Sequence, residues 1–213
     1  MPDQPAARYF DKGRVEAYTD AVFAIAATLL VLDLTTTAIG QVGSDGQLWA
    51  DLAGMWPSFS GFGVSFALLS LLWMIHLQQF RDIARADATL IWLNNARLLF
   101  VVLIPFTTSL VSDYSDYYAG RMLLPINFFF AALLGHLSWR WAAARDGHLL
   151  TEESTSQIIY QGAGGLAAVI CGFVAMAVSP WAGSWGFLAY AFNGLLTGAI
   201  QRRRLRRMGP TAS

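Results

Sequence analysis

Six long apolar segments dominate the pattern of the chain. They lie at about residues 17–39, 54–77, 90–112, 122–142, 158–178 and 181–200. A helix needs about 20 apolar residues to cross the hydrocarbon core of a bilayer, and these segments are of that length. The last segment is the weakest, because glycines interrupt it. The pattern predicts an all-α membrane protein with six transmembrane helices, which form a single domain over residues 1–213 in the lipid bilayer.

Composition supports this prediction. The chain is 55% hydrophobic and 13% charged, whereas soluble proteins carry about 25% charged residues. A soluble core of this size could not bury so much apolar surface. The formal net charge is zero, so the charge gives no reason to expect a nucleic-acid partner. The single cysteine, Cys171, excludes an intrachain disulfide.

Basic residues gather on one side of the predicted arrangement. They are Arg8, Lys12, Arg14, Arg81, Arg85, Arg140, Arg145, Arg202, Arg203, Arg204, Arg206 and Arg207. The loops on the opposite side hold Arg121 alone. Because basic loops face the cytoplasm, both termini are predicted to be cytoplasmic in a multi-pass protein of the cell membrane.

The first apolar segment, RVEAYTDAVFAIAATLLVLDL at 14–34, has two different faces. At about 100° per residue, Ile25, Leu29 and Leu32 fall on one side of a helix together with Thr28. Asp20 falls almost opposite. An aliphatic stripe of this kind suits a lipid-facing or buried surface in many membrane helices, so the pattern alone does not assign it to a pore.

Polar residues are expected to meet Asp20 near the cytoplasmic boundary, because a charge inside a membrane usually finds a partner. The candidate partners are Arg14, His76, Asn94, Asn95 and Arg97. Two interpretations are open: an ion-pair latch that holds the first three helices together, and a proton relay or ion site. Pro105, in the middle of the third segment, predicts a kink.

The external side is predicted to be acidic. Asp33 ends the first segment, and a glycine-rich, acidic loop is expected at 40–51. A negative potential there would concentrate cations. Acidic external loops also occur for reasons of topology alone.

The opening segment carries a motif, with Arg14 followed by Tyr18, Thr19 and Asp20, and then by VFAIAATLLVLD at 22–33. It resembles the signature of the transmembrane protein 175 family, R-x-x-x-F-S-D followed by V-F-A-I-A-x-T-L-L-V-L-E. That family comprises endolysosomal potassium channels and their prokaryotic homologues. NNARLLFVVLIPFTTSL at 94–110 is similar to its third-helix block, and the resemblance covers essentially the whole chain.

The resemblance implies a potassium-permeable cation channel, in which the first helix of each subunit lines the central pore of a homotetramer. Ile25, Leu29 and Leu32 would form a hydrophobic constriction, and Thr28 a layer linked to selectivity. The signature residues Arg14, Tyr18, Thr19 and Asp20 would pack away from the pore. The permeant ion would be potassium, with no cofactor.

No T-V-G-Y-G filter occurs in the sequence, so selectivity would come from side chains and residual hydration, and an aliphatic ring could gate by dewetting. One rival is a proton-coupled secondary transporter that uses Asp20, His76 and Arg97. A second is a non-conducting membrane scaffold. A third, an intramembrane enzyme, is disfavoured because the three histidines are scattered and no catalytic motif accompanies them. We therefore expect no enzymatic activity.

Overall fold

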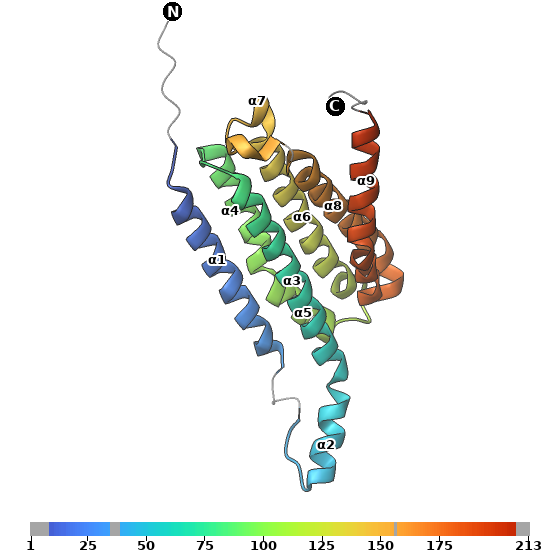
Figure 1. The fold of residues 1–213 in the computed structure, drawn as a ribbon. Helices are drawn as coiled ribbons and strands as arrows, with labels where there is room; N and C mark the ends of the chain where they lie inside the picture. Colours follow the sequence, from blue (N-terminus) through green and yellow to red (C-terminus); the bar gives the residue numbers. More distant parts are fainter. Residues whose placement is uncertain (1–8, 35–38, 156, 208–213) are drawn as a thin grey trace, which may run out of the picture.

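The protein is a bundle of long helices, described here by a computed structural model for residues 9–34, 39–155 and 157–207. α1 begins and α9 ends at the same end of the bundle (Figure 1). The main helices of the bundle are α1 (Lys12–Leu29), α3 (Trp56–Asp82), α4 (Ala88–Val102), α5 (Ile104–Asp113), α6 (Tyr118–Ala142), α8 (Gln157–Ala182) and α9 (Asn193–Arg207). The other elements are η1 (Leu30–Asp33), α2 (Asp45–Gly54), α7 (Ala144–Gly147), η3 (Glu152–Thr155) and η4 (Gly183–Phe192).

The bundle supplies six segments that can cross a membrane. Within the described residues, five stretches are long and apolar enough to do so: Lys12–Leu32, Trp56–Asp82, Ala88–Asp113, Tyr118–Ala142 and Gly162–Arg207. The last stretch reverses direction at Gly183, whose φ of +55° suits a residue without a Cβ atom. η4 and α9 then pack back along α8, so this stretch crosses twice. The predicted six-helix arrangement is confirmed.

The third crossing segment is broken at the predicted place. α4 ends at Val102, and α5 begins at Ile104 with Pro105 in its first turn. Polar side chains bond backbone carbonyls around the break: Asn127 Nδ2 of α6 donates to the Phe100 carbonyl at 2.8 Å, and Thr107 Oγ1 donates to the Leu103 carbonyl at 3.0 Å. Such bonds make a proline break tolerable inside a membrane.

The segment expected as an acidic loop at 40–51 contains a helix instead. Ser44 Oγ accepts a hydrogen bond from the backbone N–H of Gln47 at 3.2 Å, and Gln47 Oε1 accepts one from the N–H of Gly43 at 3.0 Å. This is a reciprocal cap that starts α2. α2 extends away from the other helices as a continuation of α3 (Figure 1), and none of its residues is buried.

Two apolar clusters hold the bundle together. The larger one lies between the crossing segments and includes Phe23, Leu69, Val101 and Phe128. The smaller one lies at the end of the bundle near α7, and its buried members are Phe80, Ile83, Ala86, Leu90, Trp139, Ala142, Leu149 and Leu150. Leu149 and Leu150, which follow α7, are therefore packed into this end of the bundle and are not part of a solvated loop.

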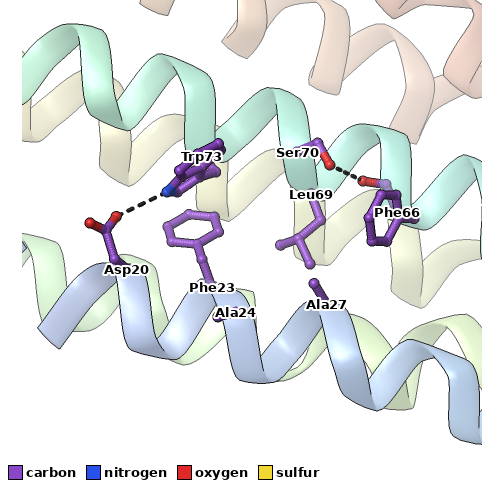
Figure 2. Close-up of a pocket in the computed structure, with 8 residues that line it drawn as sticks. All are labelled: Asp20, Phe23, Ala24, Ala27, Phe66, Leu69, Ser70 and Trp73. Carbon is purple, nitrogen blue, oxygen red and sulfur yellow. Dashed lines mark hydrogen bonds between the residues drawn. The ribbon is translucent and has the colours of Figure 1, made fainter. Parts of the chain in front are cut away.

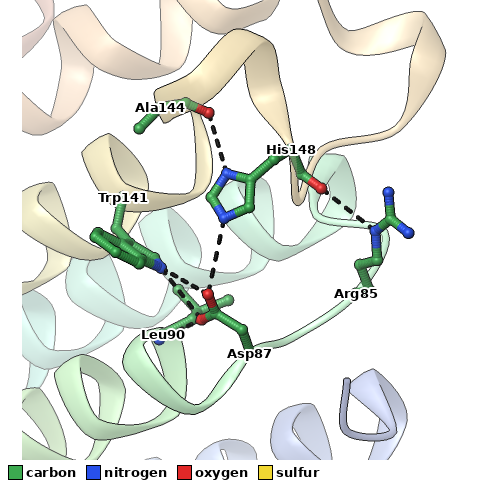
Figure 3. Close-up of polar contacts among 6 residues, drawn as sticks. All are labelled: Arg85, Asp87, Leu90, Trp141, Ala144 and His148. Carbon is green, nitrogen blue, oxygen red and sulfur yellow. Dashed lines mark hydrogen bonds and ion pairs between the residues drawn. The ribbon is translucent and has the colours of Figure 1, made fainter. Parts of the chain in front are cut away.

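A polar junction fixes the helix ends around this second cluster (Figure 3). Asp87 caps α4 by accepting a hydrogen bond from the N–H of Leu90 at 2.8 Å. The same carboxylate accepts the indole N–H of Trp141 at 3.0 and 3.2 Å and lies 3.7 Å from His148 Nε2. Arg85 Nε donates to the carbonyl of His148 at 3.3 Å. Asp87 thereby ties the start of α4 to the end of α6.

Candidate functional site

α1 buries one face against its own chain. Thr19, Phe23, Ala26 and Leu30 are buried, at the spacing of three and four residues that places them on one side of a helix. They pack against α3, α4 and α5. This face anchors α1 to the bundle.

The opposite face of α1 is exposed. Ile25 is 59% exposed, Leu29 40% and Leu32 65%, and Thr28 beside them is exposed as well. Leu32 lies in η1, where each residue turns by about 120° rather than 100°, so it falls in line with Leu29. This differs slightly from the uniform α-helical pattern expected from the sequence. A column of large aliphatic side chains is thus left largely uncovered by the described residues of its own chain.

Thr28 interrupts this aliphatic column with a hydroxyl group. Its Oγ1 donates a hydrogen bond to the carbonyl of Ile25 at 2.8 Å. The hydroxyl proton is therefore used within the helix, while the oxygen keeps lone pairs that can accept from water or bind a cation. The side chain can present an oxygen ligand at the level between Ile25 and Leu29.

Asp20 makes a different contact from the one expected. Its Oδ1 accepts a hydrogen bond from Trp73 Nε1 of α3 at 2.9 Å (Figure 2). Both residues line a groove of about 400 Å³ between α1 and α3, with Phe23 and Phe66. Arg14 is exposed. The ion pairs among the described residues are Lys12–Glu16 and Asp87–His148, so the predicted ion-pair latch at Asp20 is wrong.

The physical reason lies in desolvation. An ion pair inside a membrane requires two charges to leave water, and their attraction often fails to offset that cost. The indole N–H of Trp73 satisfies one carboxylate oxygen without burying a second charge. Trp73 was not among the partners predicted for Asp20, although it lies three residues, about one helical turn, before His76.

Asn94 contacts Thr19 rather than Asp20, for which it had been a candidate partner, and so joins α4 to α1. Asn94 Nδ2 donates to Thr19 Oγ1 at 2.8 Å, and both side chains are buried. A hydrogen bond between neutral groups is well suited to this position, because both partners would be unsatisfied if the helices separated.

Arg97 and His76 form a second buried pair. The Arg97 side chain is only 2% exposed; its Nη2 donates to the carbonyl of Leu72 at 2.8 Å, and its Nη1 lies 3.5 Å from His76 Nδ1. The guanidinium lies 5.7 Å from the ring centre of Phe23. A Cβ atom on Gly135 of α6 would lie 3.1 Å from Arg97 Cζ. The arginine thus packs between α1, α3 and α6, with no carboxylate beside it among the described contacts.

The remaining predicted network residues do not join these contacts. Tyr18 and Asn95 are exposed, as Arg14 is. Among the described hydrogen bonds, none links Asp20 to His76 or to Arg97, so the three do not form a continuous relay. The side chain of Asp33, the predicted external cation-attracting residue, lies outside the described residues.

Comparison with known proteins identifies the family. The family model described as the endosomal/lysosomal potassium channel TMEM175 matches residues 14–105. A protein of Streptomyces collinus named a potassium channel is 34% identical over 143 residues, which cover 65% of this chain and 68% of that protein. The chain belongs to the TMEM175 family. The prediction from the sequence motif is confirmed, and so is the prediction of a channel family rather than an enzyme.

Other TMEM175 relatives agree in fold and sequence. A crystal structure of a TMEM175 homologue from Chamaesiphon minutus, titled a lysosomal potassium-selective channel, has a TM-score of 0.67 and 27% identity, and the match covers 90% of this chain and 97% of that chain. The mouse protein named endosomal/lysosomal proton channel TMEM175 is 32% identical over 196 residues, which cover 87% of this chain and 37% of that protein. The chain is a multi-pass membrane protein of this family.

The region matched by the TMEM175 family model is also the region that holds the site. Residues 14–105 include the crossing part of α1, all of α3 and α4, and Pro105. α6, α8 and α9 lie outside it. The two faces of α1 and the contacts of Asp20, Asn94 and Arg97 therefore belong to the part of the chain that the family model matches.

The Asp20–Trp73 hydrogen bond can be tested by a double-mutant cycle. Asp20→Ala and Trp73→Phe should each lower the free energy of unfolding in detergent by about 1–2 kcal/mol, because each breaks a bond to a charged group. The double variant should lose less than the sum of the two. The ion preference of folded protein should stay unchanged, since Asp20 lies away from the exposed column.

Trp92→Phe is the matched control, because Trp92 is a highly exposed tryptophan on α4. It should change stability little and should not couple to Asp20→Ala. Strictly additive losses for Asp20→Ala and Trp73→Phe, or a changed ion preference in folded Asp20→Ala, would contradict this role.

Proposed function

We propose that this protein is a potassium-permeable cation channel of the cell membrane, with both termini in the cytoplasm. The observation that carries the proposal is the exposed aliphatic column of α1 with Thr28 at its centre. Membership of the TMEM175 family supports it, as do relatives that are named potassium channels. The orientation rests on the basic residues that gather at the end of the bundle where α9 finishes.

The pore would be shared by four copies of the chain. A single chain contributes one helix with this exposed column and cannot enclose a pore with it. In a homotetramer, four α1 helices surround one axis and each column meets its three equivalents. The buried face of α1 continues to hold each helix against its own bundle.

The oligomeric state can be measured directly. Purified protein in mild detergent should have about four times the 23.3 kDa mass of one chain, after subtraction of detergent. The mass should not change as the protein is diluted, because a shared pore requires a stable assembly. A monomer under conditions in which the protein still conducts would contradict the tetramer.

Ions would pass a narrow, largely apolar neck. Rings of Ile25, Leu29 and Leu32 would resist wetting, which provides a hydrophobic gate. Thr28 oxygens would replace part of the hydration shell at one level of the neck. Potassium loses hydration water more readily than sodium, so a neck with few oxygen ligands favours potassium to a modest extent. Asp33 and the acidic start of α2 would concentrate cations at the external mouth.

Substitutions along the column test these roles. Ile25→Asn and Leu29→Asn should raise conductance and reduce potassium-over-sodium preference, because amide groups hold water in the neck. Thr28→Val keeps the shape and removes the oxygen, so preference should fall without a large gain in current. Reversal potentials in liposome-derived bilayers under potassium and sodium gradients measure both properties.

Val174→Asn provides the control, because Val174 is an exposed aliphatic residue on α8. It adds the same amide at a surface that would face lipid, so conductance and preference should match the wild type. Wild-type conductance and preference in all three folded α1 variants would remove this helix from the pore.

A channel and a proton-coupled transporter differ in the driving force that moves potassium across the bilayer. A channel carries potassium current at equal pH on both sides of the bilayer. Asp20 has no hydrogen bond to the His76–Arg97 pair among the described residues, so a coupling relay through all three has no continuous path. Potassium movement that requires a proton gradient would contradict the channel proposal.

A further inference from the structure

A basic cavity lies far from α1, between α6, α8 and α9. Its volume is about 390 Å³, and its lining includes Arg140, Arg204, His136 and Trp139. No aspartate or glutamate is among the described residues that line it. Neither arginine forms an ion pair with a described residue. The cavity therefore concentrates positive charge without an acidic partner of its own.

Local packing shapes the cavity around these donors. At Gly162 of α8, a Cβ atom would lie 3.0 Å from Arg204 Nη1 and 3.5 Å from Trp139 Nε1. The absence of a side chain lets the guanidinium and the indole N–H converge over the helix. Nearby, His136 is only 8% exposed, and its Nδ1 has no hydrogen-bond partner among the described residues. The site thus holds charged and neutral hydrogen-bond donors in a restricted space.

The position of the cavity fits a membrane surface. It lies at the end of the bundle where α6 ends, α8 begins and α9 carries its basic residues. Apolar residues Ala143, Ile158 and Leu166 complete the lining. α9 and α1 lie at opposite edges of the bundle (Figure 1), and α1 packs on α3, α4 and α5 instead. This edge faces lipid if α1 is central in an assembly.

We propose that this cavity binds the phosphate group of an anionic membrane phospholipid, with the lipid glycerol and first methylene groups against Ala143, Ile158 and Leu166. Guanidinium groups recognise phosphate oxygens with paired hydrogen bonds. Basic pockets between transmembrane helices on the cytoplasmic side are suited to lipid headgroups. The proposal does not depend on which ion the protein conducts.

Native mass spectrometry of the full-length protein in neutral detergent tests this binding. Added phosphatidylglycerol should be retained, and zwitterionic phosphatidylcholine should not. Arg140→Gln and Arg204→Gln should each weaken phosphatidylglycerol binding by about tenfold or more, since each removes a charge-assisted bond. Equal retention of the two lipids by the wild-type protein would overturn the proposal.

Arg207→Gln is the charge-matched control, because it removes one positive charge from the same helix but does not line the cavity. It should leave binding within about twofold of wild type, on the additive behaviour of independent sites. If Arg207→Gln weakens binding as much as Arg204→Gln does, the tail attracts lipid diffusely and there is no site.

A second pair of variants tests the geometry without changing charge. Gly162→Ala places a methyl group 3.0 Å from Arg204 Nη1, whereas Gly164→Ala meets nothing within 4 Å. Gly162→Ala should weaken phosphatidylglycerol binding and Gly164→Ala should not. Equal behaviour of the two variants would overturn the site even if an arginine variant failed to fold. Inorganic phosphate should compete poorly; displacement of the lipid by phosphate at equal concentration would assign the site to free phosphate instead.

Discussion

A transmembrane helix that buries only one of its faces within its own chain leaves the other face to contact lipid, water or another copy of the chain. α1 is such a helix. Phe23 and Ala26 are packed into the bundle, while Ile25 and Leu29, one turn apart, are open. A lipid-facing surface would accept the same aliphatic side chains, and the Thr28 hydroxyl is bonded to the Ile25 carbonyl in either setting. In the proposed pore, the free lone pairs of the Thr28 oxygen would face water and ions.

Contacts with α3 and α4 hold α1 in one orientation, since a rotation of the helix would bury the aliphatic column and expose Phe23. Two hydrogen bonds hold this orientation. Asn94 donates to Thr19, which joins two neutral groups, and Trp73 donates to the carboxylate of Asp20. Each satisfies a polar group that would otherwise be stranded in the bilayer, and neither buries an ion pair. Arg97 differs from these two donors because its side chain is cationic. It contacts the Leu72 carbonyl, His76 and the face of Phe23.

The six apolar segments, the Pro105 break and the two faces of α1 could be predicted from the sequence, because hydrophobic length and helical spacing are local properties. The partner of Asp20 could not. Acidic and basic residues at similar depth suggested ion pairs, whereas the contact depends on which face of α3 meets α1, and this brings Trp73 rather than an arginine.

Two further features were not predicted from the sequence, and the second depends on how distant helices pack together. The helix α2 could have been anticipated from the capping pattern of Ser44 and Gln47, but the glycines and acidic residues around it indicated a loop. The cavity between α6, α8 and α9 had only a weak signal, the basic C-terminal run and GAGG at 162–165. Arg204 and Trp139 meet at Gly162 because three helices distant in sequence converge there.

Thiol accessibility tests most directly whether α1 lines the conduction path. In a background of Cys171→Ala, which removes the sole native thiol, Leu32→Cys places a cysteine at the end of the exposed column that is farther from the N-terminus, which the proposed orientation makes external. A membrane-impermeant charged thiol reagent should block most of its current, whereas Val178→Cys on α8, an exposed aliphatic position near the same end of the bundle, should keep its current. Persistent current through Leu32→Cys after reaction with the reagent, or equal block of Val178→Cys, would show that ions do not pass along α1.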